Sequence, residues 1–266
     1  GSEVSCTARY CASPSAVNFY LQATGPTPTR TPTKTITPTP TPTPTWTSPC
    51  PGTLVLQQGL NGYAGARDTW ISSWYPDENY EGPGAGQIYI RAVDKKATLL
   101  KFDLSMLGPG TVIEEATLSV YVHNWEGNMP ITVGAYQVIR AWVASEATWN
   151  KAQALEDWGL PGCNDTSTDR AADPEDEVRI SAAQGWQDFD LTELVRQWVN
   201  DPTRNQGVIL KAFSSPAEVQ LNSSNHGGTT LRQALHPLCP GYGHAHRSPS
   251  PPAIGAEVMC VIRRSS

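Results

Sequence analysis

Residues 186–211 read WQDFDLTELVRQWVNDPTRNQGVILK and carry the signals for a strand, a helix and a second strand. Apolar residues at positions 191, 194, 195, 198 and 199 lie on one face of a helix, because this spacing follows 3.6 residues per turn. Asp190 and Glu193 form a D-x-x-E pattern like a capping box, and Pro202 ends the helix because it cannot continue the helical hydrogen bonding. The apolar, β-branched run at 208–210 is typical of a strand. One short helix between two strands predicts a mostly β domain.

Short strands joined by Gly-rich and Pro-rich turns precede this stretch. The predicted strands are 53–56, 68–72, 87–91, 98–104, 116–122 and 131–138. In the segment 116–122, the inward-facing set is Ala116, Leu118, Val120 and Val122. Strands at this spacing favour an all-β fold, an antiparallel and jelly-roll-like β-sandwich with one short helix inserted near its C-terminal end.

The chain of 266 residues divides into four parts by composition. Residues 1–24 contain one apolar run, which is interpreted either as the last strand of a preceding domain or as a disordered leader. Residues 25–49 alternate Thr and Pro, which predicts an extended polyproline-II linker of the kind found in exported modular proteins. Residues 50–232 form the predicted β-sandwich, and residues 233–266 form an irregular tail without a strand period.

Motifs in a fixed order connect the folded part to a known family. They are DTWI at 68–71, NY at 79–80, LLKFDL at 99–104, ATLSVY at 116–121, EATWN at 146–150 after Trp142, FDLT at 189–192 and NQGVIL at 205–210. Together they resemble the DNRLRE-type domain, which is similar to carbohydrate-binding module family 96. The resemblance implies a non-catalytic β-sandwich of exported bacterial and archaeal proteins, often beside polysaccharide-degrading or surface domains, with alginate binding known in the family.

The end of the chain departs from this family. After TTLR at 229–232, the family pattern leads us to expect Pro and an alternating final strand, whereas the chain continues QALHPLCP. Two interpretations stay open, a shifted reading frame in the source sequence, which we favour, and a genuine divergent tail. If the tail is genuine, the sandwich lacks a strand or borrows one from another segment, and a sheet edge lies open.

Composition and missing motifs exclude several classes of function. The net charge of −6 disfavours nucleic-acid binding, and no apolar run reaches the length of about 18 residues that a transmembrane helix needs. The sequence contains no G-x-S-x-G, H-E-x-x-H or P-loop motif. Glu114 and Glu115 are adjacent, so their side chains point to opposite faces of a strand and make a poor glycosidase pair. We therefore expect no enzyme activity.

The cysteines show no C-x-x-C spacing, so a zinc site is not expected. They are Cys6, Cys11, Cys50, Cys163, Cys239 and Cys260. Some of them are expected to pair in an exported chain, and the pairing we prefer within the folded part is Cys50 with Cys163.

Aromatic residues in loops are the best candidates for carbohydrate contact, because sugar C–H groups stack on exposed aromatic faces. Trp74, Tyr75 and Tyr80 lie in SWYPDENYEGPG at 73–84, and Trp125 lies in HNWEGN at 123–128. Ligand binding and plain loop packing are equally compatible with their positions. Four other tryptophans sit in the family motifs or on predicted apolar stripes and are expected in the core, while Trp70 is undecided. The four are Trp142, Trp149, Trp186 and Trp198.

Two groups of charged residues extend the candidate site. Arg91, Lys95 and Lys96 are close in sequence and could meet a carboxylated polymer, although a solvated turn explains them too. Asp165, Asp169 and Asp173 lie in an acidic loop that could bind calcium, although the EF-hand order is absent and a solvated loop is the simpler interpretation.

The sequence therefore predicts an extracellular or cell-surface module that binds polysaccharide, of a uronate type such as alginate. Its expected partners are a polysaccharide or cell-surface glycan and the neighbouring domains of the same polypeptide. The alternative is a structural or adhesive surface module without glycan binding.

Overall fold

The computed structural model describes residues 52–81, 86–214 and 216–239. The predictions for residues 1–49 and for 240–266 lie outside the described residues. Within them, no helix is long and apolar enough to cross a membrane.

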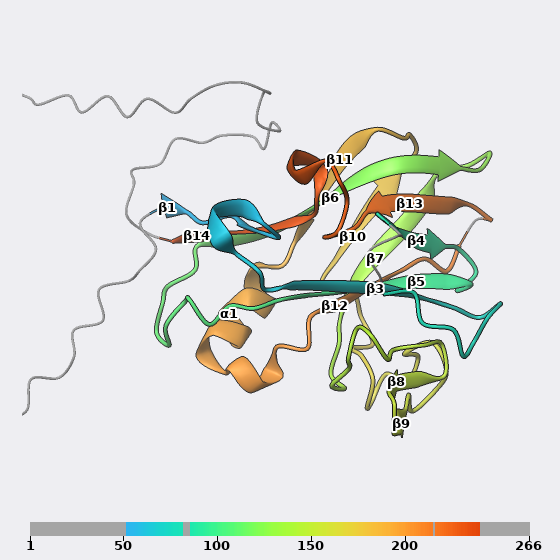
Figure 1. The fold of residues 1–266 in the computed structure, drawn as a ribbon, viewed down its shortest axis with the longest axis horizontal. Helices are drawn as coiled ribbons and strands as arrows, with labels where there is room; N and C mark the ends of the chain where they lie inside the picture. The colour runs from blue at the N-terminus through green and yellow to red at the C-terminus, as the bar shows by residue number, and fades with distance from the viewer. Residues whose placement is uncertain (1–51, 82–85, 215, 240–266) are drawn as a thin grey trace, which may run out of the picture. The chain divides into compact units, whose positions relative to one another are not determined.

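The described residues form a mostly antiparallel β domain with one α-helix (Figure 1). The N-terminal strands are β1 (Gly52–Thr53), β2 (Leu56–Gln57), β3 (Ala66–Ser72), β4 (Gln87–Arg91), β5 (Lys96–Phe102), β6 (Glu115–Glu126) and β7 (Ile131–Gln137). The later strands are β8 (Lys151–Gln153), β9 (Glu156–Asp157), β10 (Asp176–Ile180), β11 (Gly185–Asp190), β12 (Val208–Lys211), β13 (Glu218–Asn222) and β14 (Ala234–Cys239). The helix is α1 (Thr192–Asn200), and short 3-10 turns occur at Leu60–Gly62, Pro202–Arg204 and Thr229–Leu231.

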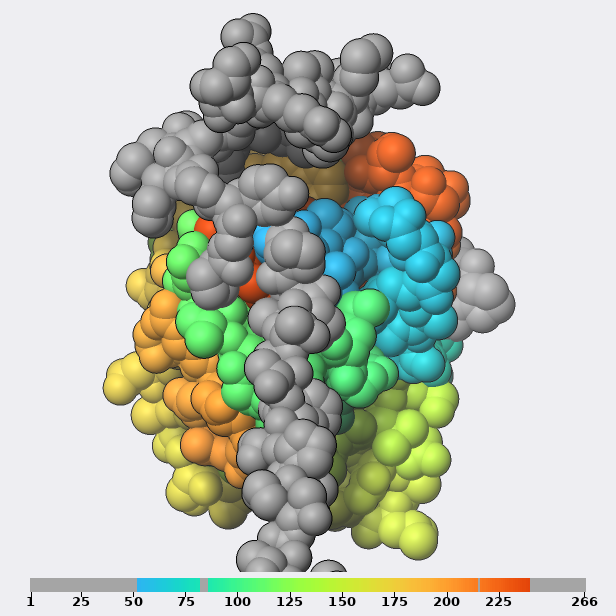
Figure 2. All heavy atoms as spheres, turned by 90° about the vertical axis from the view of Figure 1, so that its left-hand side faces the viewer, coloured from blue at the N-terminus to red at the C-terminus, as the bar shows by residue number. Residues whose placement is uncertain are grey.

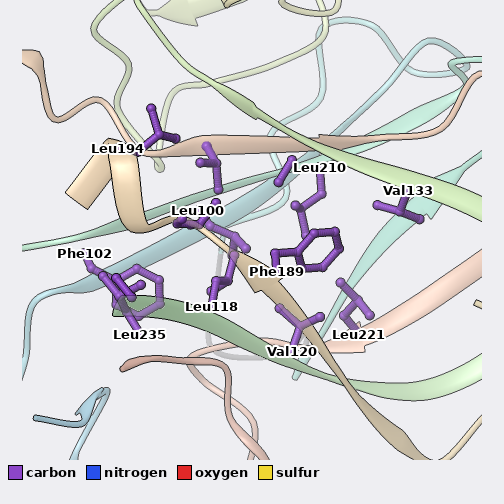
Figure 3. Packing of buried hydrophobic residues seen from close by; sticks show 14 of the residues in the cluster. Leu100, Phe102, Leu118, Val120, Val133, Phe189, Leu194, Leu210, Leu221 and Leu235 are labelled. Atoms are coloured by element: carbon purple, nitrogen blue, oxygen red, sulfur yellow. The ribbon is translucent and has the colours of Figure 1, made fainter. Parts of the chain in front are cut away.

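The sheet has two halves that face each other across the main core. One half runs β3-β5-β12-β7-β10, and the other contains β4, β13, β6, β11 and β14. The halves meet where β4 turns into β5, through the single pair Arg91 and Lys96. Side chains from both halves point toward one another in Figure 3, and the predicted inward set of β6 is fully buried. The predicted all-β sandwich is confirmed.

The helix α1 also follows the sequence pattern. Leu194, Val195, Trp198 and Val199 are buried, so the predicted apolar face packs against the core. The helix lies beside the connection between β5 and β6 (Figure 2), where the Arg196 guanidinium donates hydrogen bonds to two backbone carbonyls of that connection.

The capping box predicted at the start of α1 does not form. Asp190 accepts a hydrogen bond of 2.9 Å from the backbone N–H of Thr192, as a capping residue would, but Leu191 occupies the N-cap position. The backbone N–H of Asp190 donates to Asp176 on β10, and Glu193 pairs with Arg196. The backbone N–H that Glu193 would accept from in a capping box therefore donates to Asp176 instead.

A second core lies on the outer face of the β3-β5-β12-β7 half. We call residues 138–175, between β7 and β10, the cover segment. Trp142, Trp149 and Trp158 from the cover segment are buried against Leu99 of β5 and Ile209 of β12. These strands are consequently buried on both faces.

The predicted irregular tail is wrong for residues 234–239, which form β14. This strand pairs with β6 on one side and with β1 and β2 on the other. Leu235, Pro237 and Cys239 are buried, while His236 and Leu238 are only partly buried, which is the alternation of a half-buried strand. The domain therefore extends beyond the predicted boundary at 232, and the edge of β6 is covered.

The preferred pairing of Cys50 with Cys163 is also wrong. Cys163 is a free thiol with no exposed surface, and it lies in the second core. Burial raises the pKa of this thiol to about 12. Cys163 therefore acts as a small apolar residue in this core.

Candidate functional site

The loop that follows β3, residues 73–81, is firmly anchored. The side-chain amide of Asn79 donates hydrogen bonds of 2.7 Å to the carbonyl oxygens of both Ala144 and Ala147 in the cover segment. The backbone N–H of Asn150 in the cover segment donates in turn to the carbonyl of Pro76, at 3.0 Å. Hydrogen bonds to the cover segment therefore hold the loop that carries the candidate aromatic residues.

Trp74 and Tyr75 project from this loop. Their exposed fractions are 49% and 60%, high values for aromatic side chains. The backbone N–H of Trp74 donates a 3.2 Å hydrogen bond to the Ser72 hydroxyl at the end of β3, which fixes where the indole leaves the loop.

Two cations lie against the Trp74 ring. The Arg91 guanidinium carbon is 5.0 Å from its centroid, and the Lys96 ammonium is 5.3 Å away. Both cations pair with Glu218 of β13, at 3.2 Å and 2.9 Å respectively. Each contact of a cation with an aromatic ring contributes about 0.5–2 kcal/mol, so the cations help to hold the indole.

A second layer of aromatic rings supports the first. Trp70 is buried on β3 and stacks on Tyr80, with ring centroids 3.7 Å apart. Tyr89 on β4 lies 4.9 Å from Trp70, and the Lys96 ammonium lies over both rings. Partial burial raises the pKa of Tyr80 and of Tyr89, so both hydroxyls stay protonated at neutral pH.

Lys95 lies at the rim of this arrangement. Its carbonyl accepts hydrogen bonds from the backbone N–H and the hydroxyl of Ser73, at 2.9 Å and 3.3 Å, and its side chain is exposed. The structure therefore brings together five of the predicted residues. They are Trp74, Tyr75, Tyr80, Arg91 and Lys95.

Trp125 does not lie in a loop as predicted. Strand β6 continues to Glu126 after a bulge near Gln220 and Leu221 of β13, and Trp125 pairs with Val219. The bulge shifts the alternation by one residue, so Trp125 faces inward and packs partly buried against the main core. It is not part of the exposed aromatic surface.

The acidic loop is not arranged as a metal site. Among the described residues, no group of three or more His, Cys, Asp or Glu side chains could hold a metal ion. The Asp169 carboxylate is fully buried and accepts hydrogen bonds from Arg140 and from the backbone N–H groups of Gly159, Leu160 and Asp165. Burial alone would raise its pKa, but these donors outweigh burial and lower it. Asp169 therefore organises the loop itself.

Glu218 could not have been found from the sequence, because nothing near it in the chain marks it as the partner of two cations. Tyr89 could have been found, since it lies two residues before Arg91 on a strand and so shares its face.

The all-β sandwich thus presents two exposed aromatic rings on an anchored loop, one of them with two cations against it, which is an arrangement typical of binding modules. The chain belongs to carbohydrate-binding module family 96, whose model matches residues 62–234. The modules of this family are non-catalytic and bind carbohydrate. No curated protein of similar sequence was found.

Proposed function

We propose that the surface formed by Trp74, Tyr75, Arg91, Lys95 and Lys96, here called the Trp74 surface, binds an acidic polysaccharide of the uronate type, such as alginate. The observation that carries the proposal is the half-exposed Trp74 indole with two cations against it. A uronate residue needs both features, because it offers C–H groups on its ring face and a carboxylate at its edge.

The two kinds of contact have separate roles. The indole and the Tyr75 ring stack on sugar C–H groups, which favours pyranose rings of either charge. Arg91 can present a planar guanidinium to a carboxylate, and exposed Lys95 adds a mobile positive charge. Glu218 holds Arg91 and Lys96 in place, since one buried carboxylate contacts both.

The module acts outside the cell in this proposal, as part of a longer exported polypeptide. The Thr-Pro segment at 25–49 supports it, since such a spacer holds a binding module away from its neighbours.

Affinity electrophoresis of the full chain tests the proposal. Gels would contain alginate, polygalacturonate or fully methyl-esterified polygalacturonate, which keeps the sugar backbone but removes the charge. We expect retardation by the charged polymers and much weaker retardation by the ester. No retardation of folded protein by any of these polymers, nor by xylan, cellulose or chitin derivatives, would instead favour the structural or adhesive alternative.

Matched variants locate the site. Trp74→Ala should abolish retardation, whereas Trp186→Ala, which removes a tryptophan from β11, should leave it unchanged. Arg91→Gln should weaken binding to the charged polymers only, and Arg179→Gln on the exposed face of β10 is its control. Equal losses in a variant and its control would contradict the assignment of the site to the Trp74 surface.

A further inference from the structure

Lys211 has a completely buried side chain, which is rare for lysine. It lies on β12, beneath the cover segment. Its Nζ is 2.8 Å from Oδ1 of Asp94, in the turn between β4 and β5, and donates a 2.6 Å hydrogen bond to the carbonyl of Gly162. These groups take no part in the Trp74 surface.

Asn164 of the cover segment completes the cluster. Its Nδ2 donates hydrogen bonds of 2.8 Å to Oδ2 of Asp94 and 2.8 Å to the carbonyl of Pro161. One carboxylate therefore contacts the Lys211 amine through one oxygen and the Asn164 carboxamide through the other. The adjacent carbonyls of Pro161 and Gly162 hold the same two nitrogens from the backbone.

Two aromatic side chains flank the buried Lys211 amine, while Asp94 and Asn164 are partly buried. The Lys211 Nζ lies 5.4 Å from the ring centroid of Trp149 and 5.9 Å from that of Phe213. Burial lowers the pKa of Lys211, although the nearby Asp94 opposes this. Proton transfer from Lys211 to Asp94 is therefore easier here than in water, and it produces the neutral amine, which is the nucleophilic form.

We propose that Lys211 and Asn164 become joined by an intramolecular isopeptide bond, with Asp94 transferring the protons. The Nζ lone pair attacks Cγ of Asn164, and the Nζ–Cγ bond forms. Asp94, which holds the proton taken from the Lys211 ammonium, donates that proton to Nδ2 and accepts the one that Nζ loses. The Cγ–Nδ2 bond breaks, ammonia leaves, and Asp94 is again a carboxylic acid. An amine and a carboxamide become a secondary amide and ammonia, so no oxidant, reductant or cofactor is needed.

The position of Asp94 assigns it the catalytic role rather than that of the acceptor. It lies between the nucleophile and the carboxamide, where a general acid–base group must be. If Asp94 were the acceptor, a second acid would have to protonate its leaving oxygen. Among the described residues, Nζ of Lys211 contacts the Asp94 carboxylate and the Gly162 carbonyl, and Nδ2 of Asn164 contacts the same carboxylate and the Pro161 carbonyl, so Asp94 is the one carboxylic acid in these contacts.

The bond ties the cover segment covalently to the middle of the sheet. Strand β12 lies between β5 and β7, and the cover segment packs on all three. A cross-link from position 164 to position 211 closes the second core against local opening, which suits a module exposed to proteases outside a cell.

Mass spectrometry of the intact chain, reduced and denatured, tests the proposal directly. We expect a mass lower than the sequence mass by one ammonia. Lys211 is then acylated and resists trypsin, so a branched peptide should join residues 152–170 to residues 205–232. Fragmentation should place the link between Asn164 and Lys211.

Other outcomes overturn the proposal. The full sequence mass shows that no bond forms. Loss of one water with a link from Lys211 to Asp94 makes the wrong residue the acceptor. Loss of ammonia within a single unbranched peptide indicates a cyclic imide at an asparagine.

Variants test the roles. Asp94→Ala and Asn164→Ala should both restore the full mass, whereas Lys101→Met, at a partly buried lysine of β5, should keep the ammonia deficit. If the Asp94 variant does not fold, the mass of the unaltered protein still decides whether the bond exists.

Discussion

Trp70 and Trp74 lie four residues apart in the chain, and the structure gives them different roles. Trp70 is 9% exposed and belongs to the main core, while Trp74 is 49% exposed in the loop after β3. Trp70→Ala should lower the free energy of unfolding by about 3–5 kcal/mol, because it leaves a cavity under Tyr80. Trp74→Ala should cost only about 1–2 kcal/mol, because each of the two cation contacts is worth about 0.5–1 kcal/mol at an exposed ring, yet it should abolish retention by polysaccharide. Urea denaturation and affinity electrophoresis of both variants check this, and a large stability loss in Trp74→Ala would show that the indole is a core residue.

His236 makes the stability of the domain depend on pH. Burial lowers its pKa, and the attraction of Asp188 only partly offsets this. The folded state therefore binds the proton more weakly than the unfolded state. The free energy of unfolding is highest above a pH of about 6.5, where His236 is neutral in both states. It decreases as the pH falls through the folded-state pKa. Each unit by which folding lowers the pKa is worth about 1.4 kcal/mol.

Replacing His236 by Gln should thus reduce the loss of stability between neutral pH and pH values of about 5, where an unperturbed histidine is charged. Denaturation in urea at both pH values measures the loss. His123→Gln, at an exposed position on β6, is the matched control. An equal pH dependence in the His236 variant and the unaltered chain would contradict the assignment.

Individual elements differ in how far their sequence predicts them. The helix α1 and the alternation of β6 could be predicted, because their apolar periods match one buried face each. Strand β14 was missed because Pro237 and His236 interrupt an otherwise apolar run. The structure tolerates Pro237 in a strand and uses its carbonyl to accept a hydrogen bond from Leu54.

Strand β14 should be essential for folding. Leu235 is fully buried, and losing a buried leucine costs about 2–5 kcal/mol against a total stability of about 5–15 kcal/mol. A chain that ends at residue 232 also exposes one edge of β6. We expect it to lack a cooperative thermal transition by circular dichroism, and a chain that ends at residue 239 to keep one. Cooperative folding of the shorter chain would show that β14 is dispensable.

For the molecule as a whole, the cover segment is the part that sequence reasoning could not place. Trp142 and Trp149 were expected in the core, which is confirmed, but nothing in their spacing told which face of which sheet they cover. The reason is that the cover segment has little regular structure, so its position depends on contacts between distant residues. Glu218 was missed because its ion pairs with Arg91 and Lys96 also join residues that are distant in the chain.

The cover segment also connects the second core to the Trp74 surface, and Asn79 is the link. Its amide donates to the carbonyls of Ala144 and Ala147, both buried residues of the cover segment.

Asn79→Ala leaves two carbonyls without this partner, at a cost of about 1–3 kcal/mol each where no water replaces it. The loop that carries Trp74 should loosen, so retention by polysaccharide should fall although every residue of the Trp74 surface is still present. Limited proteolysis should show new cleavage within residues 73–81, whereas Asn225→Ala, at an exposed position, should change neither result. Normal retention with an unchanged cleavage pattern in Asn79→Ala would mean that the surface holds its shape without the cover segment.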